Sequence, residues 1–107
     1  MAQNINIVID QGTTFNAAFN IVDLNGEPLD LSSYTSNSEF KKTYMSTNAH
    51  VFTTAVDANG VVYLSMNAVT TSSAWPGRYV YDVRVTDVNG NVSRLIQGLV
   101  TVTPSVT

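Results

Sequence analysis

The stretch RYVYDVRVTDVNGNVSRLIQ, from Arg78 to Gln97, decides the fold of this 107-residue chain. Its first half alternates residue by residue, which is typical of a strand with one buried face. The side chains expected to face the interior are Tyr79, Tyr81, Val83 and Val85, and those expected to face solvent are Val80, Asp82, Arg84 and Thr86. The turn DVNG then reverses the chain into a last strand, Val92 to Thr103, so the stretch predicts a β-hairpin.

The pattern D-x-N-G occurs three times in the chain, starting at Asp23, Asp57 and Asp87. In a type I turn Asp is favoured first because its carboxylate accepts backbone N–H bonds. Gly is favoured fourth, where a left-handed residue makes a G1 bulge. A two-residue type I′ loop would explain Asn-Gly but not the Asp two residues earlier. We therefore expect type I turns with a G1 bulge.

Calcium loops and an internal repeat fit the D-x-N-G pattern less well than turns do. A calcium loop of EF-hand type needs a distal acid, and the residues that follow the three glycines, Glu27, Val61 and Asn91, do not supply one. An internal repeat would carry its whole supersecondary unit along with its turn. Here a long crossover follows the first copy, whereas strands directly follow the other two. The pattern marks strand reversals, with calcium shared between loops as the minority alternative.

The last hairpin has two registers open to it. A three-residue loop sets Arg84 opposite Arg94, a like-charge pair that costs stability. A two-residue loop pairs Val83 with Ile96 instead. A bulge at Gly98 would reconcile the two registers, and the sequence leaves the choice open.

The rest of the chain also alternates with a period of two. Further strands are expected at Ile5 to Ile9, Phe15 to Ile21, Tyr34 to Tyr44, Val51 to Val56 and Val61 to Met66, and Asn67 to Trp75 is expected to cross over with about one helical turn. Tyr79 is expected to hydrogen-bond back to this corner. Seven short strands and no amphipathic helix predict an all-β fold. We expect one immunoglobulin-like antiparallel β-sandwich over residues 1–107, without a disulfide because the chain has no cysteine.

Composition argues against several classes of partner. The chain is 44% hydrophobic but only 12% charged, so Ser, Thr and Asn supply most of its polarity. A net charge of −3 with five basic residues argues against nucleic acid, and the sole basic pair, Lys41-Lys42, is interpreted as part of a solvated strand. The first ten residues lack the features of a signal peptide, and no stretch reaches the length of a membrane span. We therefore expect folding in a cytoplasm and no membrane partner.

The sequence contains no convergent catalytic groups, so we expect no enzyme activity, no cofactor and no metal. The single histidine, His50, is interpreted as an exposed loop residue. No serine lies in a G-x-S-x-G elbow, and none of the six glycines forms a phosphate loop before a helix. Two carboxylates could serve glycoside hydrolysis, but most acids here are expected to be turn residues.

Three aromatic residues are candidates for an interface: Tyr44, Phe52 and Trp75. Trp75 lies at a corner, where it either plugs the end of the sandwich or is exposed and able to stack on a sugar ring, and both alternatives stay open. Tyr44 and Phe52 flank the polar loop from Met45 to Ala49. We therefore expect these two side chains to be contact residues on the opposite rim.

Two stretches resemble a known family when they are taken together. They are QGTTFNAAFNIVDLNGEPLDLSSYT, from Gln11 to Thr35, and PGRYVYDVRVTDVNGNVSRLIQGLVTVTPSVT, from Pro76 to Thr107. They resemble small tailed-bacteriophage virion proteins similar to the N-terminal domain of the phage upper-baseplate protein. That pattern runs as Q-G-x-x-F, then D-x-x-G-x-P-x-D-L-x-x-Y-T, then G-x-Y-x-Y-D before a hairpin and x-V-x-P. The chain departs from it at Ser32-Ser33, where Thr-Gly is commoner.

This resemblance spans nearly the whole chain and implies an immunoglobulin-like sandwich with an assembly role and no catalytic residues. We expect a non-enzymatic structural protein of a tailed-phage virion, made in the host cytoplasm, that acts as an adaptor at the tail, baseplate or neck. Its partners would be multiple copies of other virion proteins, docked on unpaired strand edges. One alternative is a capsid decoration or cement protein of the phage head. The other, less favoured, is a carbohydrate-binding or host-adhesion module with Trp75 as its platform.

Overall fold

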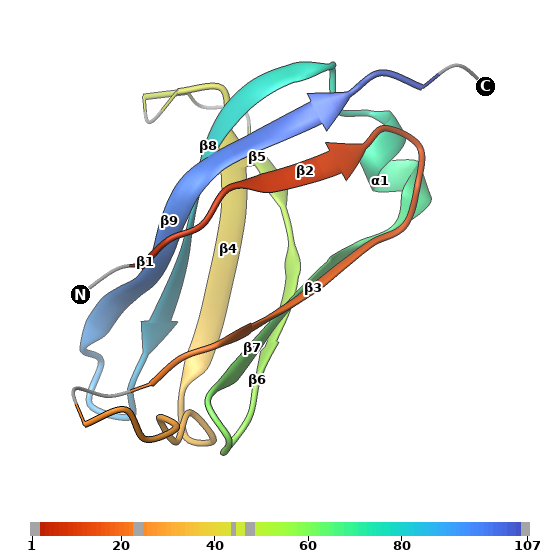
Figure 1. Ribbon diagram of the computed structural model, residues 1–107. Coiled ribbons are helices and arrows are strands. Elements are labelled where there is room, and N and C mark those ends of the chain that lie inside the picture. The colour runs from red at the N-terminus through yellow and green to blue at the C-terminus, as the bar shows by residue number, and fades with distance from the viewer. Residues whose placement is uncertain (1–2, 23–24, 44, 47–48, 106–107) are drawn as a thin grey trace.

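The computed structural model describes residues 3–22, 25–43, 45–46 and 49–105, which form two β-sheets and one short helix (Figure 1). The elements along the chain are β1 (Gln3–Asn4), β2 (Ile7–Asp10), β3 (Phe15–Asn20), β4 (Thr35–Lys41), β5 (Ala49–Val51), β6 (Thr53–Val56), β7 (Val61–Met66), α1 (Ala68–Ser72), β8 (Gly77–Thr86) and β9 (Val92–Thr103). Within this part of the chain, α1 is far too short to cross a membrane.

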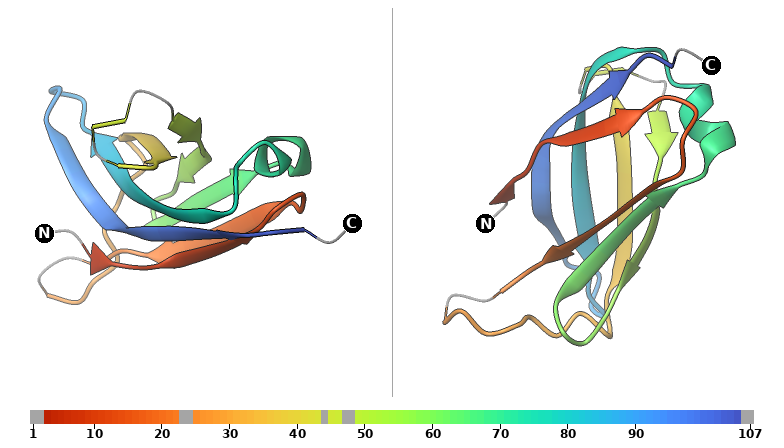
Figure 2. Two further views of the ribbon diagram at one scale, coloured as in Figure 1. Left: turned by 90° about the horizontal axis from the view of Figure 1, so that it is seen from above. Right: turned by 45° about the vertical axis from the view of Figure 1, so that its right-hand side comes forward.

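The strands build a sandwich of two sheets (Figure 2). The larger sheet has the order β1-β9-β8-β4-β5, with β2 also paired to β9, and the smaller sheet has the order β3-β7-β6. This arrangement confirms the all-β, immunoglobulin-like sandwich. Neighbouring strands are antiparallel except that β1 and β2 run parallel to β9. The expectation of a wholly antiparallel sandwich is therefore wrong for the N-terminal strands.

Specific contacts hold the N-terminal segment against β9. The Tyr81 hydroxyl donates to the Ile5 carbonyl at 2.6 Å, and the Ile5 N–H donates to the Gln97 carbonyl at 3.0 Å. The Asn6 side-chain oxygen accepts the Leu99 N–H at 3.1 Å. Burial raises the pKa of Tyr81 to about 12, so its hydroxyl keeps its proton and continues to donate at neutral pH. Because this segment belongs to the larger sheet, β7 is the one described strand that pairs with β3.

The core lies between the two sheets and confirms the alternation predicted for β8. The buried side chains include Tyr79, Tyr81, Val83 and Val85 in β8, Val62, Leu64 and Met66 in β7, and Ile96, Val100 and Val102 in β9. Burying each such side chain contributes about 1.5–3 kcal/mol, most of which offsets the entropy lost on ordering the chain. The intervening β8 residues are exposed or half-buried, so one face of the strand supplies the core and the other meets solvent.

Two of the three D-x-N-G turns lie wholly within the described residues, and both are type I turns with a G1 bulge, as predicted. The Gly60 N–H donates to the Asp57 carbonyl at 3.4 Å, and the Gly90 N–H donates to the Asp87 carbonyl at 3.1 Å. The glycine φ angles are +78° and +86°, in the left-handed region. The first turn is only partly described, because Asp23 falls outside the described residues.

The first residue of each turn also fixes the turn through its carboxylate. Asp57 accepts the Val61 N–H at 3.0 Å, and Asp87 accepts the Asn91 N–H at 2.9 Å. These bonds are the main reason why the pKa of both carboxyl groups lies below its ordinary value. Both carboxylates therefore act as parts of their turns.

The β8–β9 hairpin uses both candidate registers, with a bulge between them. The pairs on either side of it are Arg84–Arg94 and Val83–Ile96. The extra residue is Leu95, so the two registers are reconciled by a bulge at Leu95 and not at Gly98, the position considered from the sequence. Arg94 Nε lies 3.2 Å from the carboxylate of Asp82, which compensates the like charge opposite it. The bulge at Leu95 allows the Asp87 turn to keep its G1 bulge while Val83 still pairs with Ile96.

The single strand expected from Val51 to Val56 is in fact two strands in different sheets. β5 pairs with β4 in the larger sheet, whereas β6 pairs with β7 in the smaller one. The chain crosses between the sheets at Phe52, whose N–H donates to the Ser38 carbonyl at 3.0 Å. Side chains keep alternating through the crossing, so the pattern alone does not reveal the change of sheet.

Candidate functional site

Trp75 is the predicted interface residue that the structure places at the surface. It is 81% exposed, although Ala74 directly before it is fully buried. The corner that carries it joins α1 to β8, beside the end of β2 (Figure 1). Of the two alternatives for Trp75, the plug is therefore wrong, because the indole projects into solvent.

Hydrogen bonds hold the backbone of this corner. The Tyr79 hydroxyl donates to the Trp75 carbonyl at 2.6 Å, which confirms the expected bond back to the corner. Burial raises the pKa of Tyr79, so the hydroxyl remains a donor. The Gln11 side-chain amide donates to the Ala74 carbonyl at 2.9 Å. Because hydrogen bonds already hold this backbone, binding of a partner at the indole costs little further backbone entropy.

Thr71 ties the helix before the corner to the β2–β3 loop. Its hydroxyl donates to the Thr13 carbonyl at 2.7 Å and accepts the Gly12 N–H at 3.1 Å, and Thr71 is fully buried. Neither Thr71 nor Gln11 was predicted from the sequence to support the corner. Nothing in the run AVTTSS distinguishes Thr71 from its polar neighbours, because its role depends on a loop almost sixty residues earlier.

Phe52 is not an interface residue, contrary to our expectation. It is 3% exposed, and its ring lies 5.4 Å from that of Phe40 and 5.7 Å from that of Phe15, measured between centroids. Burial follows from its place at the crossing between the sheets, where its side chain points into the core. Tyr44 lies outside the described residues. Of the three candidates, Trp75 alone is a described surface residue.

His50 is also placed differently from the exposed loop position we expected. It belongs to β5 and is half-buried. Its ring stacks on Phe40 with 4.9 Å between centroids and meets the Tyr79 ring edge-on at 6.0 Å. These contacts make His50 part of the packing around the aromatic core.

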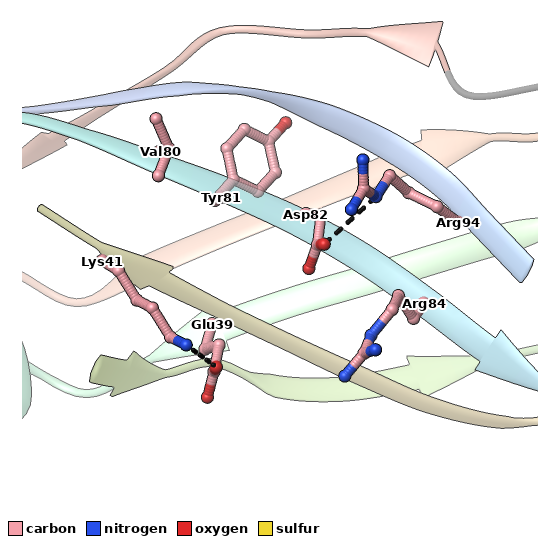
Figure 3. Close-up of a pocket in the computed structure, with 7 residues that line it drawn as sticks. All are labelled: Glu39, Lys41, Val80, Tyr81, Asp82, Arg84 and Arg94. Carbon is pink, nitrogen blue, oxygen red and sulfur yellow. Dashed lines mark ion pairs between the residues drawn. The ribbon is translucent and has the colours of Figure 1, made fainter. Parts of the chain in front are cut away.

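A second surface feature is the charged outer face of the larger sheet, where a shallow pocket lies across β4, β8 and β9 (Figure 3). Lys41 Nζ lies 3.4 Å from the Glu39 carboxylate, and Arg94 is paired with Asp82. Arg84 projects across the same face and makes no ion pair with any described residue. The Arg84 guanidinium on this face is available to an anionic group of a partner. Such an ion pair would be exposed to solvent and would contribute about 0–1 kcal/mol to binding.

The described carboxylates take part in local structure. The Asp30 carboxylate accepts the N–H and the hydroxyl of Ser32 at 3.0 and 2.7 Å, and these bonds lower the pKa of Asp30. The Asp10 carboxylate accepts the Thr103 hydroxyl at 2.7 Å. Within the part of the chain that the structure describes, no three His, Asp or Glu side chains come together as metal ligands. The acids therefore cap turns and join strands.

No family model matches the sequence, and no curated protein does. Solved structures do resemble the fold. An internalin-like protein of Listeria monocytogenes matches with a TM-score of 0.51 and 18% identity over 95% of this chain, which spans 28% of that protein. The SrpA adhesin of Streptococcus sanguinis matches with a TM-score of 0.53 and 17% identity over 92% of this chain, which spans 55% of that protein. At these identities the likeness is one of fold.

Proposed function

We propose that this domain is a non-enzymatic structural protein of a tailed-phage particle, an adaptor that docks on other virion proteins through Trp75. The observation that carries the docking role is the 81% exposed indole on a corner fixed by hydrogen bonds. Tryptophan is enriched among the residues that dominate binding energy at protein interfaces. The class of partner comes from the resemblance of Gln11 to Thr35 and Pro76 to Thr107 to phage virion proteins.

The chemistry of the described acids supports a role without catalysis. The carboxylates of Asp57 and Asp87 accept turn N–H groups, and that of Asp82 is paired with Arg94. A catalytic acid or base needs to be free to exchange its proton with a substrate in a cleft. These groups hold turns and strands instead.

The test is incorporation into purified particles of the phage that encodes the chain. Mass spectrometry of particles carrying wild-type protein gives its copy number, and electron microscopy gives its place. Trp75→Ala should lower the copy number strongly while its melting temperature stays unchanged. The matched control is Val88→Ala, because Val88 is 79% exposed in the β8–β9 turn, at the other end of β8.

Each outcome bears on a different part of the proposal. Absence of the wild-type protein from mature particles would refute the virion role. Equal incorporation of the two variants would retain that role and exclude Trp75 as the docking residue. If the protein is found on the head, its role is that of a capsid decoration protein and not of an adaptor at the tail, baseplate or neck.

A second candidate function, a carbohydrate-binding or host-adhesion module, is favoured by the same exposed indole. Flat aromatic rings are suitable platforms for stacking on sugar rings, and Trp75 is accessible for this. A glycan array probed with wild-type protein and with Trp75→Ala tests the alternative. Binding that disappears in the variant would favour adhesion, whereas no binding to any glycan would count against it.

A further inference from the structure

The smaller sheet differs from the larger one in carrying no charge on its strands. Its strands read FNAAFN in β3, TTAV in β6 and VVYLSM in β7. All five basic residues of the chain, Lys41, Lys42, Arg78, Arg84 and Arg94, lie on or next to strands of the larger sheet. An uncharged sheet has no electrostatic barrier against contact with an identical sheet.

Among the described strands, β3 is the longest edge strand, and none of them pairs with its outer edge (Figure 2). β5, by contrast, is only three residues long. The β6 edge is joined to the larger sheet, because the Ser36 hydroxyl donates to the Thr54 hydroxyl at 2.8 Å. Proteins usually block an edge strand with a charge, a proline or a bulge, and β3 contains none of these.

The backbone direction shows which groups the open edge presents. The Ile21 N–H donates to the Gly60 carbonyl at 2.7 Å, on the β7 side. Backbone groups of successive residues in a strand point to alternate sides. The N–H and C=O groups of Asn16, Ala18 and Asn20 therefore point away from β7, and their side chains are exposed. We call these three residues the β3 edge.

The β3 edge is complementary to itself. If two copies meet antiparallel about a two-fold axis through Ala18, that residue faces its own copy, and Asn16 faces Asn20 of the second copy. In this register every residue of the β3 edge lies opposite another residue of the β3 edge. The N–H and C=O groups of both residues point toward each other, so each pair can form the two hydrogen bonds of an antiparallel hydrogen-bonded pair. The amide side chains of Asn16 and Asn20 both donate and accept, so they also match across the axis.

We propose that the β3 edge pairs with the β3 edge of a second copy of this chain, which would join the two smaller sheets into one continuous sheet. The occupant is a second copy because the register that satisfies the backbone groups also matches identical side chains. The isologous two-fold contact is the commonest symmetry of soluble dimers. The β3 edge does not include Trp75, so the dimer and the proposed docking corner are separate features.

Sedimentation of the pure protein over a concentration series tests the pairing. We expect a species of twice the monomer mass of 11.6 kDa. Ala18→Lys places two like charges opposite each other at the axis and should weaken the dimer by roughly tenfold or more. Ala55→Lys is the matched control, because Ala55 is exposed on β6 of the same sheet, away from the β3 edge. A monomer at all concentrations, or equal dimers in both variants, would overturn the proposal.

Two mixing variants test the occupant and the register. Asn16→Lys with Asn20→Lys in one chain, and Asn16→Asp with Asn20→Asp in the other, should each be monomeric because like charges face across the axis. Their mixture should form a dimer, since each lysine then faces an aspartate. Failure of the mixture to associate, while both variants keep the wild-type circular dichroism spectrum, would refute pairing through β3. These measurements use pure protein, so their result does not depend on the virion role.

Discussion

Gly60→Ala should destabilise the domain much more than Gly90→Ala, although the two glycines occupy the same position of the same kind of turn. Their φ angles, +78° and +86°, carry nearly the same strain for an alanine, about 1–2 kcal/mol. Both substitutions also lower the conformational entropy of the unfolded chain, which raises the free energy of unfolding by about 0.4–1 kcal/mol. These two effects are common to both variants and cancel in their difference.

What differs is the space around the new methyl group. At Gly90 nothing lies within 4 Å of an added Cβ. At Gly60 the Cβ would overlap the Ile21 carbonyl oxygen and lie 2.9 Å from the Leu29 nitrogen, and both contacts are backbone atoms that no side-chain rotation relieves. The turn would have to shift and strain the 2.7 Å bond from the Ile21 N–H to the Gly60 carbonyl. Such overpacking costs about 1–3 kcal/mol.

Urea unfolding followed by circular dichroism gives the two free energies. We expect a loss of about 1 kcal/mol for Gly90→Ala and about 2–4 kcal/mol for Gly60→Ala. The difference of about 2 kcal/mol corresponds to roughly 8 °C in melting temperature for a domain of this size. Equal unfolding midpoints for the two variants would refute the close backbone approach at Gly60.

Three further predictions concern single side chains. Tyr79→Phe removes the bond to the Trp75 carbonyl and should lower the free energy of unfolding by about 1–2 kcal/mol, measured in urea; an unchanged midpoint would show that the bond contributes nothing. The pKa of Asp87 is lowered by folding, so its ionised form stabilises the domain above the ordinary value of 3.8, and this stability is lost as pH falls through the folded pKa. Asp87→Asn should therefore flatten the fall in melting temperature on acidification, and a curve as steep as that of the wild type would contradict this. Arg84→Glu replaces the like-charge pair with Arg94 by an opposite pair and should raise the free energy of unfolding by about 0.2–1 kcal/mol at low salt, and less at high salt; a decrease would argue against the observed register.

Local signals predict much of the fold. The alternation in β8 follows directly from which side chains avoid water, and the D-x-N-G turns follow from backbone angles that glycine alone adopts readily. The bond from Tyr79 to the corner is predictable because the bonded groups are four residues apart. Each of these features depends on residues close together in the chain.

Features that depend on distant partners are not predictable in this way. Phe52 is buried against expectation because the alternation of Val51 to Val56 is the same whether one sheet or two sheets hold it. The parallel pairing of β2 with β9 depends on contacts between opposite ends of the described chain. The support that Thr71 gives to the Trp75 corner also depends on a distant partner, the Thr13 carbonyl. Local propensity contains no information on such contacts.

The pairing of the N-terminal segment with β9 has a consequence for how the protein folds. The bond between Asn6 and Leu99 spans 93 residues, and β9 is the strand on which β1, β2 and β8 all assemble. A large loop must therefore close before this part of the sheet gains its hydrogen bonds, and such non-local topologies fold in about milliseconds to seconds. In a cell, the segment around β2 leaves the ribosome long before its partner strand exists. Until then β2 has no partner strand to hold Ile7 and Ile9 in the core where they are buried, so this interval exposes apolar side chains to chaperones and to aggregation.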